Sequence, residues 1–300
     1  MSEPRVSVIM RSKNSDWVIA QALAGLYSQD LRDFELLVVD SGSTDRTLEI
    51  VRQYPGRLVE IPAGDYYPGR VLNEAIARTA GEIVVFLNSD CVCLSPHSLG
   101  RLVAAFDDGI TQAAFARQLP RPEAHDWVRR DYAEAFPAAG PAPSWLTLSL
   151  PFAAMRRSAW HDRPFYTEAW GSEDTEWGTE ARALGWRIRY VPEALVMHSH
   201  NYTLKQLYGR RFIEGEADAF IRLDRDSLRA TAGRLARSVA RDLVFSLRRG
   251  HLAEAALAAP RRAVYHWAYY RGHRLGEERL ATGNRDASVG QSAVLSRYEA

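Results

Sequence analysis

The sequence predicts an α/β protein in which a mostly parallel sheet is flanked by helices. Short apolar runs alternate with longer amphipathic segments through residues 6–87. Two of these runs end directly at polar residues, Asp40 and Asn88, as strands do where they leave a core. Alternation of single strands with single helices is typical of a parallel sheet that is covered on both faces.

The first half of the chain supplies the alternating elements. We expect strands at residues 6–10, 34–39, 58–61 and 83–87, because these runs are apolar and rich in residues that favour strands. We expect helices at residues 16–27, 43–54 and 69–80, where apolar residues recur at helical spacing. Asn14, Ser15 or Asp16 would cap the first helix, and Gly81 would end the third.

The second half is less regular. We expect strands at residues 113–119, 152–155, 187–191 and 194–197, and helices at 123–136, 172–184 and 203–221. A loop rich in Pro, Ala and Gly covers residues 137–143. Beyond residue 224 the chain is rich in Arg, Ala and Leu and is expected to be helical, with a frayed tail from Gly283. The sequence therefore predicts one domain over residues 1–222 and a basic helical extension over residues 223–300.

Composition places the chain among globular proteins with a sizeable core. It has 300 residues, of which 46% are hydrophobic and 25% charged. A net charge of +1 gives no sign of a nucleic-acid partner. The charge is uneven, however, because 11 arginines stand against three acidic residues between Arg225 and Arg274.

Three features indicate a cytoplasmic protein. Cys91 and Cys93 are too close in sequence to pair easily, so no disulfide framework is expected. The first residues lack the basic and then apolar pattern of a signal peptide. No apolar run approaches the ~18 residues that a membrane span requires.

Several polar residues should meet at one edge of the sheet. Ligands of parallel sheets bind beyond the carboxyl ends of the strands, and Ser12, Asp40 and the turn Asn88-Ser89-Asp90 fall at such ends. The carboxylate of Asp40 could accept hydrogen bonds from a pyrimidine ring or a ribose hydroxyl, or it could stabilise its own turn.

Asp90 is a candidate ligand for a divalent metal. An ion that bridges two phosphates needs only one or two carboxylates from the protein. Asn88 would add no charge, so the expected site has a single carboxylate. In the alternative interpretation, Asp90 caps the helix that follows. His198 and His200 alternate along an expected strand and should face opposite sides, so at most one of them, His198, would join the metal.

A second polar cluster follows later in the chain. Glu173 and Asp174 open an expected helix, where carboxylates suit the helix dipole or could hold a general base for a hydroxyl group. Lys205, Arg210 and Arg211 lie on the next expected helix and could bind a diphosphate or form a solvated face.

Six pieces of the sequence, in this order, resemble the family-2 glycosyltransferases of the GT-A fold, and in particular their bacterial rhamnosyltransferase-like branch. The resemblance extends over residues 5 to 222. The pieces are Val6-Ser-Val-Ile-Met10, Val39-Asp-Ser-Gly-Ser-Thr-Asp45, Gly69-Arg70 with Asn73, Phe86-Leu-Asn-Ser-Asp90, Gly171-Ser-Glu-Asp174 and His198.

The resemblance implies an inverting transfer of a sugar from a nucleotide-diphosphate donor to a hydroxyl acceptor, with Mg²⁺ or Mn²⁺ as cofactor. For the donor, it implies that Asp40 contacts the base and that Arg70, beside Gly69, lies near the ribose or phosphates. It implies that Asp90 and His198 bind the metal. It also implies that Asp174, beside Glu173, is the catalytic base and that Arg210 or Arg211 stabilises the diphosphate. Two departures stand out. Asn88, before Ser89, replaces an acid that many relatives carry. The stretch Arg11-Ser12-Lys13-Asn14 is unusually basic and is expected to tune recognition of the base.

The partners expected from this resemblance are a UDP-, dTDP- or GDP-linked donor and a hydroxyl acceptor, either a glycan, a lipid-linked sugar or a small molecule. The basic C-terminal helices would contact the inner face of a membrane peripherally or form a homodimer. Two other functions stay open. One is a nucleotide-sugar-binding protein without catalysis; the other is a sugar-phosphate nucleotidyltransferase, although no Gly-rich basic loop follows Met10.

Overall fold

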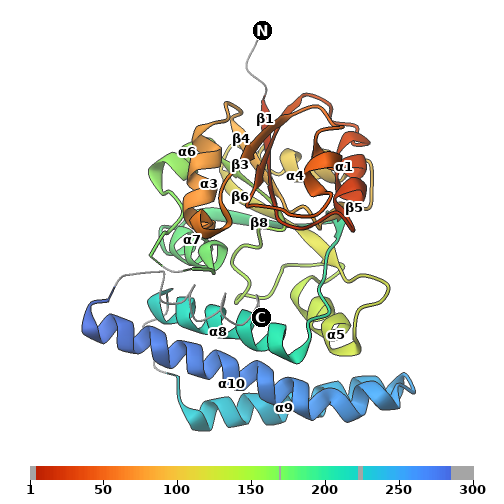
Figure 1. The fold of residues 1–300 in the computed structure, drawn as a ribbon, viewed down its shortest axis with the longest axis vertical. Coiled ribbons are helices and arrows are strands. Elements are labelled where there is room, and N and C mark those ends of the chain that lie inside the picture. The colour runs from red at the N-terminus through yellow and green to blue at the C-terminus, as the bar shows by residue number, and fades with distance from the viewer. Residues whose placement is uncertain (1–4, 169, 222–225, 285–300) are drawn as a thin grey trace. The chain divides into compact units, whose positions relative to one another are not determined.

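The computed structural model describes residues 5–168, 170–221 and 226–284 (Figure 1). The described chain forms two compact units. Unit 1 contains the residues up to 121 together with 132–165 and 177–198, and unit 2 contains residues 122–131, 166–176 and those from 199 onward. The expected boundary at residue 222 and most of the expected frayed tail lie outside the described residues.

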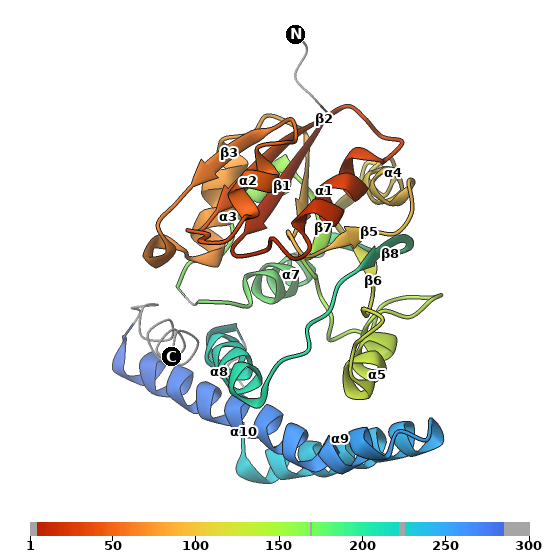
Figure 2. The same ribbon diagram turned by 45° about the vertical axis from the view of Figure 1, so that its right-hand side comes forward.

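Unit 1 is built on one mixed sheet (Figures 1 and 2). Its strand order is β3-β2-β1-β4-β7-β6-β8-β5, and the first four of these run parallel to one another. β7 is antiparallel to both of its neighbours, so the α/β class is confirmed with a sheet that is mixed. The strands are β1 (Val6–Ser12), β2 (Phe34–Asp40), β3 (Arg57–Glu60), β4 (Ile83–Leu87), β5 (Val92–Cys93), β6 (Thr111–Leu119), β7 (Phe152–Arg156) and β8 (Arg187–Met197).

Helices cover both faces of this sheet, which explains why its central strands, such as β4, are apolar. Alternate side chains of β1 enter different core clusters, with Val8 and Met10 on one side and Ile9 on the other. Helices α1 (Ile19–Tyr27) and α4 (Ser98–Ala104) pack into the first cluster, and α3 (Pro68–Ala77) and α7 (Glu173–Ala183) into the second. All five residues of β4 are buried.

Several expected boundaries were wrong for local reasons. The helix expected at residues 43–54 is only α2 (Thr47–Val51), because the Asp45 carboxylate accepts the Thr47 N–H (3.0 Å) in a preceding turn. The two strands expected at residues 187–191 and 194–197 form the single strand β8, whose register shifts opposite Ala116 and Arg117. Short elements that the pattern did not predict are η1 (Ala63–Asp65), β5 and α6 (Arg157–Asp162).

Two expected helix caps were also wrong. α1 begins without a side-chain cap, and the backbone carbonyl of Ser15 accepts the N–H groups of Val18 and Ile19 instead. α3 ends at Ala77, so Gly81 does not cap it. Gly81 is needed for a different reason, because a Cβ at that position would lie 2.5 Å from the backbone nitrogen of Ser7 on β1.

Unit 2 consists largely of three long helices, α8 (Leu204–Ile221), α9 (Leu228–Arg248) and α10 (Leu252–Thr282). α10 packs against both α8 and α9. A small apolar cluster of Phe212, Ile213 and Ala268 joins α8 to α10, and a buried ion pair between Arg262 and Asp242 (2.6 Å) joins α10 to α9. Helix α5 (Asp126–Ala135) runs from unit 2 into unit 1. Within the described residues, no helix has the length and apolar character needed to cross a membrane.

Candidate active site

Asp90 lies in a turn that follows β4 directly, and the surrounding backbone holds this turn in place. The Ser89 N–H donates to the carbonyl of Arg11 (3.2 Å), and the Ser89 hydroxyl bonds to that of Ser15 (2.8 Å). The guanidinium of Arg121 donates to the Asp90 carbonyl (2.6 Å). These contacts leave the Asp90 carboxylate as the group that the turn presents, with 16% of its side chain exposed.

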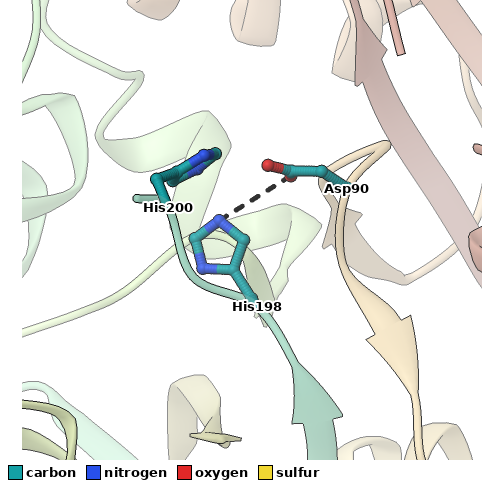
Figure 3. A group of neighbouring side chains, drawn as sticks. All are labelled: Asp90, His198 and His200. Carbon is teal, nitrogen blue, oxygen red and sulfur yellow. Dashed lines mark ion pairs between the residues drawn. The ribbon is translucent and has the colours of Figure 1, made fainter. Parts of the chain in front are cut away.

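His198 faces this carboxylate. It follows the end of β8, and its Nε2 lies 3.7 Å from Oδ1 of Asp90 (Figure 3). Its other ring nitrogen, Nδ1, lies 2.9 Å from Oε1 of Gln118, whose amide nitrogen donates to the Ser149 hydroxyl (2.8 Å). Nδ1 also lies 3.3 Å from the hydroxyl of Tyr132. With the carbonyl oxygen of Gln118 facing it, Nδ1 would carry the proton and donate it, and Nε2, which faces Asp90, would keep its lone pair.

The expectation that His200 would face away was wrong. β8 ends at Met197, so residues 198–200 do not follow the alternation of a strand. One ligand atom each from Asp90, His198 and His200 lie within 4.8 Å of one another (Figure 3). A carboxylate and two imidazoles at this spacing form a donor set that suits a divalent transition metal such as Mn²⁺.

Asp40 occupies the expected edge of the sheet but is engaged locally. It is fully buried at the end of β2, beside Ser12 of β1 in the strand register. Both of its carboxylate oxygens accept hydrogen bonds from Ser43, one from the N–H (2.8 Å) and one from the hydroxyl (2.6 Å). The structure therefore shows the turn-stabilising role, and contact with a nucleotide base stays a prediction.

Arg11 connects the β4 turn to the segment before α3. Its guanidinium donates to Oδ1 of Asn88 and to the hydroxyl of Tyr66, each at 3.4 Å. The group of this turn that faces the arginine is therefore a neutral amide, which adds no charge to the turn. Arg70, next to the buried Gly69 at the start of α3, is exposed and places its guanidinium 4.9 Å from the ring centre of Tyr67.

Within unit 2, Glu173 and Asp174 open α7 as expected. Ser172 adopts a left-handed backbone (φ 54°), and its carbonyl accepts the Glu176 N–H (2.9 Å). Glu173 is buried, and one oxygen of Asp174 accepts the N–H of Thr175 (2.8 Å). This geometry stabilises the start of the helix and leaves the functional assignment of the two acids as a prediction.

The two candidate arginines of α8 both pair with Glu214 and differ in their other surroundings. The negative charge of Glu214 is the main cause of the raised pKa of Arg210, and the charges of Asp174 and Glu173 add to it. Arg210 is therefore electrostatically coupled to the acidic pair while about half of its side chain stays exposed. The guanidinium of Arg211 lies 3.9 Å from the ring centre of Tyr265 on α10.

Gln118, Ser149 and Arg121 are residues that sequence reasoning did not assign to the metal site. Gln118 lies in β6, and Arg121 follows that strand by two residues. Gln118 is buried in β6, and a buried amide needs hydrogen-bond partners, but its burial is not visible in the sequence alone.

Comparisons with known proteins identify the family of the chain. The family model described as glycosyl transferase family 2 matches residues 7–163. The O-antigen chain rhamnosyltransferase RfbN of Salmonella typhimurium is 25% identical over 286 residues, which cover 91% of this chain and 90% of that protein. The O-antigen chain rhamnosyltransferase WbaN of Salmonella anatum is 27% identical over 255 residues, which cover 81% and 79%.

The fold is shared with a solved glycosyltransferase. The mannosyltransferase PcManGT from Pyrobaculum calidifontis, determined with GDP-Man and Mn²⁺, matches with a TM-score of 0.62 and 21% identity over 92% of this chain and 88% of that one. This likeness confirms the expected GT-A-type fold, and the two relatives confirm the similarity to the bacterial rhamnosyltransferase branch. The chain belongs to glycosyl transferase family 2 and is a sugar-transferring enzyme of the hexosyltransferase type.

Proposed function

We propose that this glycosyltransferase moves a sugar, with inversion, from a nucleotide-diphosphate donor to a hydroxyl acceptor in a metal-dependent reaction. The observation that carries the proposal is the arrangement of Asp90 and His198. The carboxylate and Nε2 are 3.7 Å apart, and Gln118 fixes the ring in the tautomer that can bind a metal.

The residues present fit a divalent ion. Asp90 and His198 would hold it, with His200 as a third donor close by. Such an ion neutralises the charge that develops on a departing diphosphate. Mn²⁺ accepts both imidazole and carboxylate ligands, whereas Mg²⁺ prefers oxygen ligands, so the two histidines favour Mn²⁺. The PcManGT structure, which contains Mn²⁺, supports this choice by analogy.

The chain's own residues would carry out the remaining chemistry. The carboxylate of Asp174 removes the proton of the acceptor hydroxyl as that oxygen attacks the anomeric carbon. The bond between this carbon and the diphosphate oxygen breaks on the opposite side, which inverts the configuration. Arg210 supplies positive charge that stabilises the leaving group. Glu173 adds its negative charge to that of its neighbour Asp174.

The names of the relatives support an acceptor class. RfbN and WbaN are O-antigen chain rhamnosyltransferases, so we propose that this chain also acts in the synthesis of a cell-surface polysaccharide, on a glycan carried by a lipid. A UDP-, dTDP- or GDP-linked sugar would be the donor. This role would place the enzyme in the cytoplasm, next to the inner face of the membrane.

Product analysis with the Asp174→Asn variant tests the proposal. We expect the native chain to release a nucleoside diphosphate from a nucleotide sugar in the presence of Mn²⁺ and a glycan acceptor. The variant should lose at least about a hundredfold in kcat, while its affinity for the nucleotide stays close to native. Binding without release would instead indicate a nucleotide-sugar-binding protein, and release of pyrophosphate would indicate a nucleotidyltransferase.

A further inference from the structure

The outward face of α9 carries basic side chains without exposed acids on the same face. Arg229, Arg237 and Arg248 are exposed and project within roughly 100° of one another at the 3.6-residue period of a helix. Arg241 is exposed beside them. The buried residues of the helix, Thr231, Asp242 and Ser246, lie away from this arc, so the arc points away from the packing contacts of unit 2.

The acidic residues of this region turn inward. Asp242 is 3% exposed at its side chain and pairs with Arg262 of α10 (2.6 Å). Asp226, just before the helix, is 7% exposed and pairs with Arg234 (2.5 Å). Because these acids are taken up in ion pairs at buried positions, the outward face of α9 is positively charged overall.

Large apolar side chains share this exposed surface. Val244 is 50% exposed and Leu247 54% exposed at the end of α9, and Leu252 is 70% exposed just across the turn that leads into α10. Exposed apolar side chains clustered beside arginines are typical of a surface that binds another body.

We propose that α9 and the turn between α9 and α10 bind the surface of an anionic phospholipid membrane. The arginines would bind lipid phosphates, and Val244, Leu247 and Leu252 would enter the boundary between headgroups and acyl chains. Charge complementarity selects this occupant, because a second copy of the same basic face would be repelled by the first. The proposal does not depend on the metal site or on catalysis.

Vesicle flotation of the full chain tests this surface directly. We expect binding to vesicles that contain phosphatidylglycerol and little binding to vesicles of phosphatidylcholine alone. Raising the salt from about 0.1 M to about 0.5 M should weaken the binding, because it shortens the screening length. Binding of equal strength to both kinds of vesicle, or to neither, would overturn the proposal.

Two variants and a matched control identify the surface. The triple variant Arg229→Glu, Arg237→Glu and Arg248→Glu should lower the vesicle partition coefficient at least tenfold, and Leu247→Ser with Leu252→Ser should lower it several-fold. The control changes the exposed Arg52, Arg78 and Arg101 of unit 1 to Glu, which alters the net charge equally. Equal losses in the control would contradict the proposal.

Independent measurements separate membrane binding from unfolding and from self-association. The thermal unfolding temperature of each variant shows whether it is folded, and sedimentation velocity shows its oligomeric state. A native dimer that the α9 variant converts to a monomer, with vesicle binding unchanged, would assign this face to a second copy of the chain and overturn the membrane proposal.

Discussion

At the scale of single residues, the candidate metal site depends on the side chains behind its ligands as well as on the ligands themselves. The carbonyl oxygen of Gln118 faces Nδ1 of His198, and the amide nitrogen of Gln118 donates to the Ser149 hydroxyl. The hydroxyl of Tyr132 lies 3.3 Å from the same ring nitrogen. Without this chain of hydrogen bonds, the imidazole would divide its population between two tautomers and two ring orientations. A ligand that must be reoriented before it binds gives a weaker site.

We therefore expect Gln118→Ala to weaken metal binding by about 10- to 100-fold, as the loss of a partner behind a metal-binding histidine does. A Mn²⁺ titration of the free protein, monitored by electron paramagnetic resonance, measures this affinity without any need for activity. Gln53→Ala, just beyond the end of α2, is the matched control, since Gln53 is exposed. Unchanged affinity in Gln118→Ala would show that His198 is not oriented in this way.

His266 makes unit 2 sensitive to acid. Burial, reinforced by the positive charges of Arg211, Arg262 and Arg234, lowers the pKa of His266 to about 4, and Asp131 opposes this shift. The ring accepts or donates a hydrogen bond with Ser238 (2.8 Å). Between the folded pKa and the ordinary unfolded value near 6.5, the unfolded chain binds more protons, so stability falls as the pH drops through this window.

We expect about 1–2 kcal/mol of stability to be lost through His266 between about pH 7 and pH 5, after allowance for solvent screening. His266→Gln keeps a polar group near Ser238 and removes the titration. Its unfolding temperature should therefore fall less than that of the native chain over the same pH interval. An identical pH dependence in the two proteins would assign the acid sensitivity to other groups.

At the scale of elements, most strands of unit 1 were predictable and many helix ends were not. A buried strand such as β4 leaves a continuous apolar run, which is visible in sequence. The end of α3 was missed because Gly81 looked like a helix cap, whereas it is required where the chain passes close to Ser7. Contacts between distant segments of this kind leave no periodic signal.

The same limit applies to the metal site. Asp90 and His198 could be named from sequence, because motifs at strand ends point to them. The predicted orientation of His200 was wrong because it depended on where β8 ends. Strand ends are poorly determined by the local sequence pattern. Gln118 was missed as a partner of His198, because the pairing of β6 with β8 brings the two together and no local motif marks it.

Close contact between α8 and α10 gives a prediction for unit 2. A Cβ at Gly272 of α10 would overlap the carbonyl oxygen of Phe212 on α8, and backbone cannot move aside as a side chain can. We expect Gly272→Ala to destabilise the chain by about 2 kcal/mol or more. Urea denaturation followed by circular dichroism measures the change.

A glycine of α9 serves as the control. Gly233 has only the flexible end of Arg237 near its Cβ position (3.7 Å), so Gly233→Ala should be neutral or stabilising by up to about 1 kcal/mol, which is the helix propensity of alanine over glycine. Destabilisation of equal size in both variants would show that the contact of Gly272 with α8 is not the cause.

At the scale of the whole molecule, the two units carry different parts of the proposed reaction. Unit 1 holds the candidate metal ligands Asp90 and His198, and unit 2 holds Asp174 and Arg210. The proposed mechanism requires that both sets act on one bound substrate. Nucleotide binding and turnover should therefore respond differently to changes in the two units, and this difference can be measured on the intact chain.

A ligand that binds only the folded chain stabilises it and so raises its unfolding temperature. At a ligand concentration of a hundred times the dissociation constant, the free energy of unfolding rises by about 2.7 kcal/mol. For a chain of this size, with an unfolding entropy of about 2.1 cal/mol/K per residue, the increase should be about 4–5 °C. We expect such an increase from one of UDP, dTDP or GDP together with Mn²⁺, and a much smaller one when EDTA replaces the metal.

Asp90→Asn should abolish most of the metal-dependent increase in unfolding temperature, because it removes the carboxylate that would hold the ion. Asp174→Asn should retain it, because the proposed base acts on the acceptor, and a full shift in Asp90→Asn would remove Asp90 from metal binding.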